Sequence, residues 1–136
     1  MALSFKCCTI LDAGGYSVDT FLWLALGHLV GDWLLQNDWM ARGKRISFFT
    51  WPGMVHYAIY TAVVMGVLWL SGSQGRGAAL YLAVGAVVFV SHWLIDAADL
   101  ARGWMRLYRQ TDREAVRVMV DQTLHLLVLA GLVLGM

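Results

Sequence analysis

The stretch Leu24-Ala-Leu-Gly-His28-Leu-Val-Gly-Asp32-Trp-Leu-Leu-Gln36 decides the fold of this chain. It is an apolar run that is interrupted only by His28, Asp32 and Gln36, each four residues after the last. In an α-helix, residues four apart lie one above the other on the same face. The stretch therefore predicts an apolar helix that carries a single polar stripe.

The same stripe recurs twice further along the chain. His92 and Asp96 repeat the spacing in Phe89-Val-Ser-His92-Trp-Leu-Ile-Asp96, and Asp121 and His125 repeat it in reversed order. Three occurrences in so short a chain argue against coincidence. We interpret these stripes as parts of one site.

The composition places the helices in a bilayer. The 136 residues are 60% hydrophobic and 14% charged, whereas the apolar share of a soluble domain is about 45–50% with glycine included. Fourteen glycines against one proline suit closely packed transmembrane helices. The formal net charge of +1 gives no reason to expect nucleic acid as a partner. We expect a single membrane domain with lipid as its surroundings.

Hydropathy divides this domain into four spans. A helix that crosses the hydrocarbon core needs about 20 apolar residues, and four segments come close to that length: 18–36, 53–70, 78–100 and 118–136. We therefore expect an all-α, polytopic membrane bundle of four transmembrane helices. The bundle is built as two similar hairpins, because each half has a His-x-x-x-Asp helix, a basic loop containing Ala-Arg-Gly, and a helix with one histidine near its start.

The ends and loops complete this prediction. Residues 1–17 are expected to form an N-terminal interfacial segment ahead of the four-helix domain of residues 18–136. Cys7 and Cys8 in that segment are adjacent, so they predict no framework of cross-links. Lys and Arg concentrate in the loops 37–52 and 101–117. The positive-inside rule then places both loops in the cytoplasm and both chain ends outside.

The polar residues of the four spans share one depth. At a rise of about 1.5 Å per residue they all fall within a slab roughly 10 Å thick near the cytoplasmic side. An unpaired carboxylate at the middle of a bilayer costs about 2.5–3.5 kcal/mol, so the aspartates must be neutralised inside the bundle. The residues of this slab are His28, Asp32, His56, His92, Asp96, Asp121 and His125.

A divalent cation is the partner that these residue types favour. Imidazole and carboxylate groups bind zinc, manganese and iron, and the seven residues offer more ligands than one tetrahedral zinc uses. We expect them to hold zinc in the first place, as one ion or two, with manganese and iron as alternatives. Gln36, Gln122 and Ser91 are candidates for orienting the ligands.

If the centre is catalytic, its chemistry is hydrolysis. The metal would activate a water molecule, and a spare aspartate among Asp32, Asp96 and Asp121 would act as general base. The depth near the cytoplasmic leaflet suggests an amphiphilic or lipid-linked substrate. Whether the chain is an enzyme is left open.

Three other interpretations compete with the metal centre. The same residues could line a route for protons or metal ions across the membrane, although the outer halves of the last three spans are almost entirely apolar. They could form a purely structural hydrogen-bond network. Four histidines on four helices would also allow a bis-histidine haem, which would leave three aspartates unexplained.

The motifs also carry a family resemblance. They are Gly27-His28-Leu-Val-Gly-Asp32-Trp-Leu-Leu-Gln36-Asn-Asp-Trp39-Met, His56, Ser91-His92-Trp-Leu-Ile-Asp96 and Asp121-Gln122-Thr-Leu-His125. Together they resemble a group of small bacterial and phage membrane proteins classed as a domain of unknown function, number 3307. The resemblance implies a compact multi-span protein of the bacterial inner membrane and no established reaction. A homo-oligomer is an open alternative to a monomer.

Overall fold

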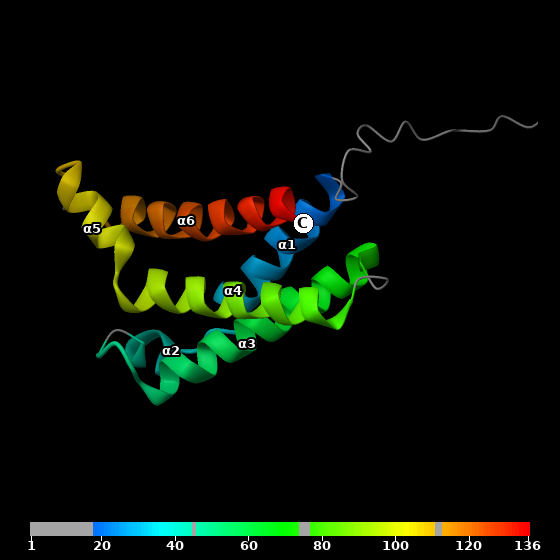
Figure 1. Cartoon of the computed structure of the whole chain (residues 1–136). Helices are drawn as coiled ribbons and strands as arrows, with labels where there is room; N and C mark the ends of the chain where they lie inside the picture. Colours follow the sequence, from blue (N-terminus) through cyan, green and yellow to red (C-terminus); the bar gives the residue numbers. More distant parts are fainter. Residues whose placement is uncertain (1–17, 45, 74–76, 111–112) are drawn as a thin grey trace, which may run out of the picture.

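The computed structural model describes residues 18–44, 46–73, 77–110 and 113–136, and its elements are all helical, with no strand among these residues (Figure 1). The segment 1–17, with Cys7 and Cys8, lies outside the described residues, so its interfacial role stays a prediction. The helices are α1 (Val18–Leu29), η1 (Val30–Leu34), α2 (Asp38–Gly43), α3 (Trp51–Leu68), η2 (Trp69–Ser73), α4 (Ala78–Ala97), α5 (Leu100–Leu107) and α6 (Glu114–Gly135).

The first expected span is two elements rather than one α-helix. After α1 the chain widens into the π-helix η1, where the N–H of Leu35 donates to the carbonyl of Val30 at 3.0 Å. Gly31 lets this turn approach α3 closely, because a Cβ there would lie 3.2 Å from the Cα of Tyr60. Single π turns inside helices are frequent at functional sites, and Asp32 is buried in this one.

Among the described residues, three helices are long and apolar enough to cross a membrane: Trp51–Gly72, Ala78–Ala97 and Glu114–Gly135. The first of them is capped by Thr50, whose hydroxyl accepts a hydrogen bond from the N–H of Gly53 at 3.2 Å. The preference of Ser, Thr, Asp and Asn for this capping position explains why the helix starts there. The 12 residues of α1 and the 5 of η1 form a shorter element. The first of the four expected spans, residues 18–36, is therefore not among the helices of membrane-crossing length.

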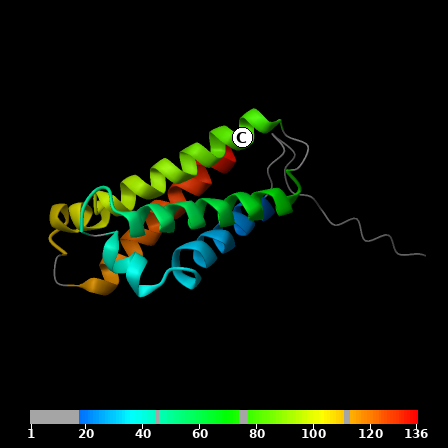
Figure 2. The same ribbon diagram turned by 90° about the horizontal axis from the view of Figure 1, so that it is seen from below.

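The two basic loops contain the short helices α2 and α5. Asn37 caps α2 by accepting a hydrogen bond from the N–H of Met40 at 3.0 Å. Asp99 precedes α5 in the left-handed conformation, with φ of 46°, and caps that helix by accepting a hydrogen bond from the N–H of Arg102. Both short helices lie at the end of the bundle away from the C-terminus, as Figures 1 and 2 agree.

An apolar core fills the bundle between the polar residues and the C-terminal end. Its fully buried members come from all four long elements, and include the phenol ring of Tyr60. By contrast, many leucines and valines of α1, α4 and α6 are exposed on the outside, which is the distribution expected when lipid is the surrounding solvent. The buried core residues are Leu24, Tyr60, Val64, Leu68, Val84, Val88 and Leu129.

Candidate metal centre

Four histidines from four helices meet in the interior. His28, His56, His92 and His125 come from α1, α3, α4 and α6, and none has more than 2% of its surface exposed. The ring centroids of His28 and His125 are 5.3 Å apart, those of His56 and His92 are 5.0 Å apart, and those of His92 and His125 are 4.5 Å apart. The structure thus brings together the four histidines that the sequence analysis placed at one depth.

Four ligand atoms among these helices form one compact group. We define this four-atom group as Asp32 Oδ1, His56 Nε2, His92 Nε2 and Asp96 Oδ2. His56 Nε2 lies 3.2 Å from Asp32 Oδ1, 3.6 Å from Asp96 Oδ2 and 3.0 Å from His92 Nε2. His92 Nε2 lies 3.7 Å from Asp32 Oδ1 and 3.6 Å from Asp96 Oδ2.

Five of the six separations in this group are close to those between the ligands of a four-coordinate metal ion. Ligands at 2.0–2.1 Å from a tetrahedral ion lie about 3.3–3.4 Å from one another. The five separations above run from 3.0 to 3.7 Å, and the two carboxylates approach within 4.8 Å. The group could therefore hold a metal ion with little movement of its side chains.

Lys44 is a member of this cluster that the sequence interpretation assigned to a basic loop. Its side chain is only 8% exposed, and its ammonium donates to Asp96 Oδ2 at 2.7 Å and lies 3.8 Å from Asp32 Oδ1. Lys44 follows α2 directly, and Gly43 allows that helix to pack against Pro52 at the start of α3. The loop thus delivers a cation to the buried carboxylates.

One ammonium does not balance the carboxylates. With neutral imidazoles, Asp32, Asp96 and the nearby Asp121 carry three negative charges against the single charge of Lys44, which leaves two uncompensated. Buried charges are costly unless they are paired, and one divalent cation would cancel the excess. Protonated histidines are the other source of positive charge at this place.

A second group of ligand atoms adjoins the first and shares Asp32. It consists of Asp32, Asp121 and His125, which offer atoms within 4.8 Å of one another. His125 Nδ1 lies 2.8 Å from the backbone carbonyl of Asp121 and donates its hydrogen there, since a carbonyl can only accept. The other nitrogen, Nε2, is then a bare lone pair, and it is buried without a hydrogen-bond partner among the described residues.

Gln122 connects His28 to the shared carboxylate. Its amide nitrogen donates to Asp32 Oδ2 at 2.8 Å, so its carbonyl oxygen accepts from His28 Nε2 at 2.8 Å. His28 Nδ1 in turn accepts from the hydroxyl of Tyr60 at 3.1 Å. Both nitrogens of His28 are engaged, so in this arrangement His28 orients Asp32 through Gln122 and does not offer a free ligand atom.

The two remaining candidates lie away from the ligand atoms. The hydroxyl of Ser91 donates to the carbonyl of Val88 in its own helix at 3.2 Å. The side-chain oxygen of Gln36 is buried with no hydrogen-bond partner in the described part of the chain. Of the supporting residues expected from the sequence, Gln122 is the one that contacts the cluster.

Lys44 and Tyr60 are the members of the cluster that the sequence interpretation missed. Tyr60 stacks on His92 with ring centroids 3.7 Å apart. A signal for Tyr60 existed, because it follows His56 by one helical turn. For Lys44 the only signal was the unbalanced charge of the aspartates.

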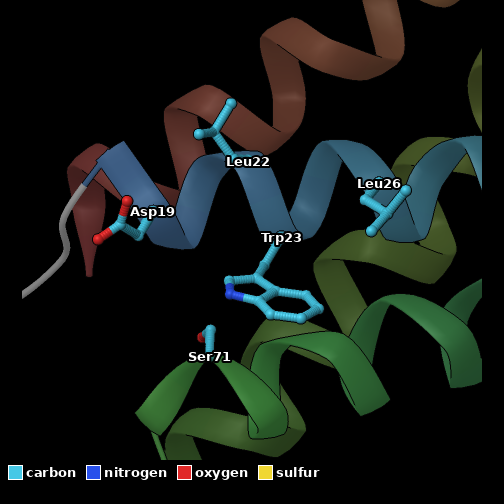
Figure 3. Close-up of a pocket in the computed structure, with 5 residues that line it drawn as sticks. All are labelled: Asp19, Leu22, Trp23, Leu26 and Ser71. Carbon is cyan, nitrogen blue, oxygen red and sulfur yellow. The ribbon is translucent and has the colours of Figure 1, made fainter.

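A groove of about 450 Å³ lies at the other end of the bundle. Asp19, Leu22, Trp23 and Leu26 of α1 line it together with Ser71 of η2, and the indole of Trp23 points toward Ser71 (Figure 3). Asp19 lies roughly three and a half turns before Asp32 along the same element. The groove therefore lies away from the candidate ligand atoms.

Comparison with known proteins yields one match. A family of proteins described as "Protein of unknown function (DUF3307)" matches residues 20–136. No curated protein and no solved structure matches the chain. The geometry of the cluster is therefore the basis for any statement about function.

Proposed function

The chain belongs to the family of proteins of unknown function DUF3307, and we propose that it is an integral membrane protein that binds a divalent cation at Asp32, His56, His92 and Asp96. Zinc is the first choice, because nitrogen and oxygen donors in a tetrahedral arrangement are typical of it. Manganese and iron bind the same donor types.

One observation carries this proposal. Two carboxylate oxygens and two imidazole nitrogens from three different elements converge, and five of their six separations lie between 3.0 and 3.7 Å. Lys44 donates to Asp96 Oδ2 and lies 3.4 Å from His56 Nε2, and Gln122 donates to Asp32 Oδ2. These donors leave the negative charge of the aspartates only partly balanced, which supports a cation at the centre.

The proposal includes the placement in the membrane. The element α1 with η1 is the fourth span beside the three long helices, and the loops that contain α2 and α5 face the cytoplasm. The arginines of these loops support this orientation, as does their position at one end of the bundle in Figures 1 and 2. The metal centre then lies near the cytoplasmic leaflet of a bacterial inner membrane.

We propose hydrolysis of an amphiphilic or lipid-linked ester as the activity. A metal ion held by Asp32, His56, His92 and Asp96 would supply Lewis acidity and would lower the pKa of a nearby water molecule. In hydrolysis the water oxygen would bond to the ester carbon or phosphorus as the bond to the leaving oxygen broke. Asp121, the carboxylate that is not a ligand in this group, would carry the proton from the water to the leaving oxygen.

A second candidate function is the movement of protons or metal ions through the same residues. The chain of hydrogen bonds from Tyr60 through His28 and Gln122 to Asp32 favours it. The fully buried apolar core beyond Tyr60, which includes Val64 and Leu68, speaks against a continuous polar path across the bundle. A haem is supported less, since the facing nitrogens of His56 and His92 lie 3.0 Å apart and leave no room for a porphyrin between them.

Elemental analysis of the protein purified in detergent tests the proposal. We expect about one equivalent of metal in the wild type and loss of it in His92→Ala and Asp96→Asn. Asp38→Asn is the matched control, because the side chain of Asp38 is 90% exposed on α2. Substoichiometric metal in the wild type, after reconstitution with zinc, manganese and iron in turn, would overturn the proposal. A flux assay in liposomes separates the transport alternative from the hydrolase.

A further inference from the structure

We propose that Asp32, Asp121 and His125 form a second cation site that fills when a phosphate group binds, so that the substrate is a phosphate ester of an amphiphile. This inference rests on the proposed function, because the second ion shares Asp32 with the first. It assigns a separate role to each of the two groups of ligand atoms.

The ring of His125 is oriented by one nitrogen and leaves the other, Nε2, available as a ligand. Its side chain is 2% exposed, and its Nε2 has no hydrogen-bond partner among the described residues although it is buried. Its Nδ1 hydrogen is fixed on the carbonyl of Asp121 at 2.8 Å. Histidines that bind metals usually donate their other N–H to a carbonyl or carboxylate in this way, which sets the tautomer and the ring orientation.

The carboxylates of Asp32 and Asp121, the other two proposed ligands, are oriented by Gln122. The amide nitrogen of Gln122 lies 2.8 Å from Asp32 Oδ2 and 3.4 Å from Asp121 Oδ2, so one side chain orients both carboxylates. Asp32 also reaches the four-atom group through Oδ1. A carboxylate shared between two ions is compatible with the spacing of about 3.5–4 Å found in two-metal hydrolytic sites.

The two groups differ in how many ligands they offer. The four-atom group supplies four, which completes a tetrahedral shell. The group of Asp32, Asp121 and His125 supplies three, and catalytic zinc sites keep three protein ligands plus one position for water or substrate. Asp121 also opens to the outside, since its side chain is 27% exposed against 3% for Asp32 and Asp96. We therefore place the substrate at the second group.

The charge of the site selects an anionic substrate. One divalent cation balances the three carboxylates and Lys44, so a second one would leave two positive charges in a buried place. Such an excess is costly unless an anion arrives with the ion. A phosphate monoester carries about this charge and offers several acceptor oxygens, as phosphorylated side chains do. The position of the site within the spanning helices favours an ester with an apolar chain.

The reaction that follows is the hydrolysis of the phosphate ester. A water oxygen forms a bond to phosphorus, the bond between phosphorus and the ester oxygen breaks, and the alcohol leaves with the proton that the water gives up. The products are inorganic phosphate and a lipid alcohol. No oxidant or further reactant is needed.

Binding of Mn²⁺, measured by equilibrium dialysis with and without inorganic phosphate, tests the inference. We expect one equivalent of Mn²⁺ in the wild type without phosphate and two with it. Electron paramagnetic resonance should then show exchange coupling between the two ions, since Asp32 links them. A short-chain phosphate monoester should replace phosphate at lower concentration, and the corresponding alcohol should not.

Variants of the proposed ligands test where the second equivalent of Mn²⁺ binds. His125→Ala and the partly exposed Asp121→Asn should bind one equivalent with or without phosphate. Thr123→Ala is the control and should behave as wild type, because the Thr123 hydroxyl bonds only to its own helix on the exposed face. One equivalent in the wild type under both conditions, or two in His125→Ala, would overturn this inference alone. The absence of Mn²⁺ binding under every condition would overturn this inference, and the absence of zinc and iron binding as well would overturn the proposed function with it.

Discussion

The Nε2 atoms of His56 and His92 lie 3.0 Å apart and belong to neighbouring helices, α3 and α4. Two imidazoles at this distance cannot both carry hydrogen on the facing nitrogens, because two N–H groups would collide. They share either one proton or one cation. The carboxylates of Asp32 and Asp96 on either side favour positive charge between these two nitrogens, and the predictions below test the proposal that a metal ion supplies it.

Lys44→Met should strengthen metal binding. The ammonium of Lys44 lies 2.7 Å from Asp96 and 3.8 Å from Asp32, so its charge opposes that of an incoming cation. We expect the dissociation constant for Zn²⁺ to fall at least tenfold, since charges about 4 Å apart interact by several kcal/mol even at a protein-like dielectric. Competition with a fluorescent zinc chelator measures it.

Lys44→Met should also lower the free energy of unfolding of the metal-free protein. Removal of one partner from a buried ion pair costs about 3–5 kcal/mol, which thermal unfolding in detergent with a chelator would reveal. Arg42→Met is the control, because the side chain of Arg42 is 79% exposed. Equal zinc affinity in Lys44→Met and the wild type would show that Lys44 does not compete with the ion.

Gln122→Leu should lower metal affinity although it removes no proposed ligand. Gln122 joins His28 to Asp32 through hydrogen bonds of 2.8 Å on each side. Loss of a residue that orients a ligand typically costs 10–100-fold in metal affinity, and we expect a decrease in this range by zinc titration. Retention of wild-type affinity would mean that Asp32 keeps its position without this bridge.

Gly31→Ala should destabilise the bundle. A Cβ at this position would lie 3.1 Å from a ring atom of Tyr60 and 3.2 Å from its Cα, so the backbone of η1 must move away from α3. Overpacking of this kind costs about 1–3 kcal/mol. Gly66→Ala is the control, because a Cβ there meets nothing within 4 Å. Equal unfolding temperatures for the two variants would contradict the close approach.

Labelling of single cysteines should reveal the proposed sidedness. In a background in which Cys7 and Cys8 are replaced by serine, a membrane-impermeant maleimide should label Gly77→Cys in intact spheroplasts. Tyr108→Cys, at the exposed end of α5, should react only after the membrane is opened. The reverse pattern would place the basic loops outside the cell and overturn the assignment made from Lys and Arg.

The four-residue spacing of histidines and aspartates in the sequence predicts much of the cluster. It placed His92 and Asp96 on one face of α4, and both contribute to the four-atom group. This succeeded because the period of a helix is fixed by local geometry. The same rule grouped His28 with Asp32 as ligands, whereas the π turn between them leaves His28 bonded to Gln122 and Tyr60.

The parts that sequence reasoning missed depend on the path of the chain in three dimensions. Lys44 enters the site because α2 folds back against α3, and nothing in the hydropathy of the loop indicates this return. The π-helical η1 arises where Gly31 meets Tyr60, which is a contact between distant positions. Periodicity therefore predicted the residues on long helices and could not predict those placed by tertiary packing.

The origin of Lys44 outside the long helices has a consequence for biogenesis. In the proposed orientation, Asp32 and Asp96 enter the bilayer on separate helices, while the ammonium of Lys44 arrives with a loop that stays at the cytoplasmic surface. A newly inserted chain must carry these acids protonated, or accompanied by a translocation partner, until that loop docks. Docking of α2 against α3 would thus be the step at which these acids gain their ammonium partner.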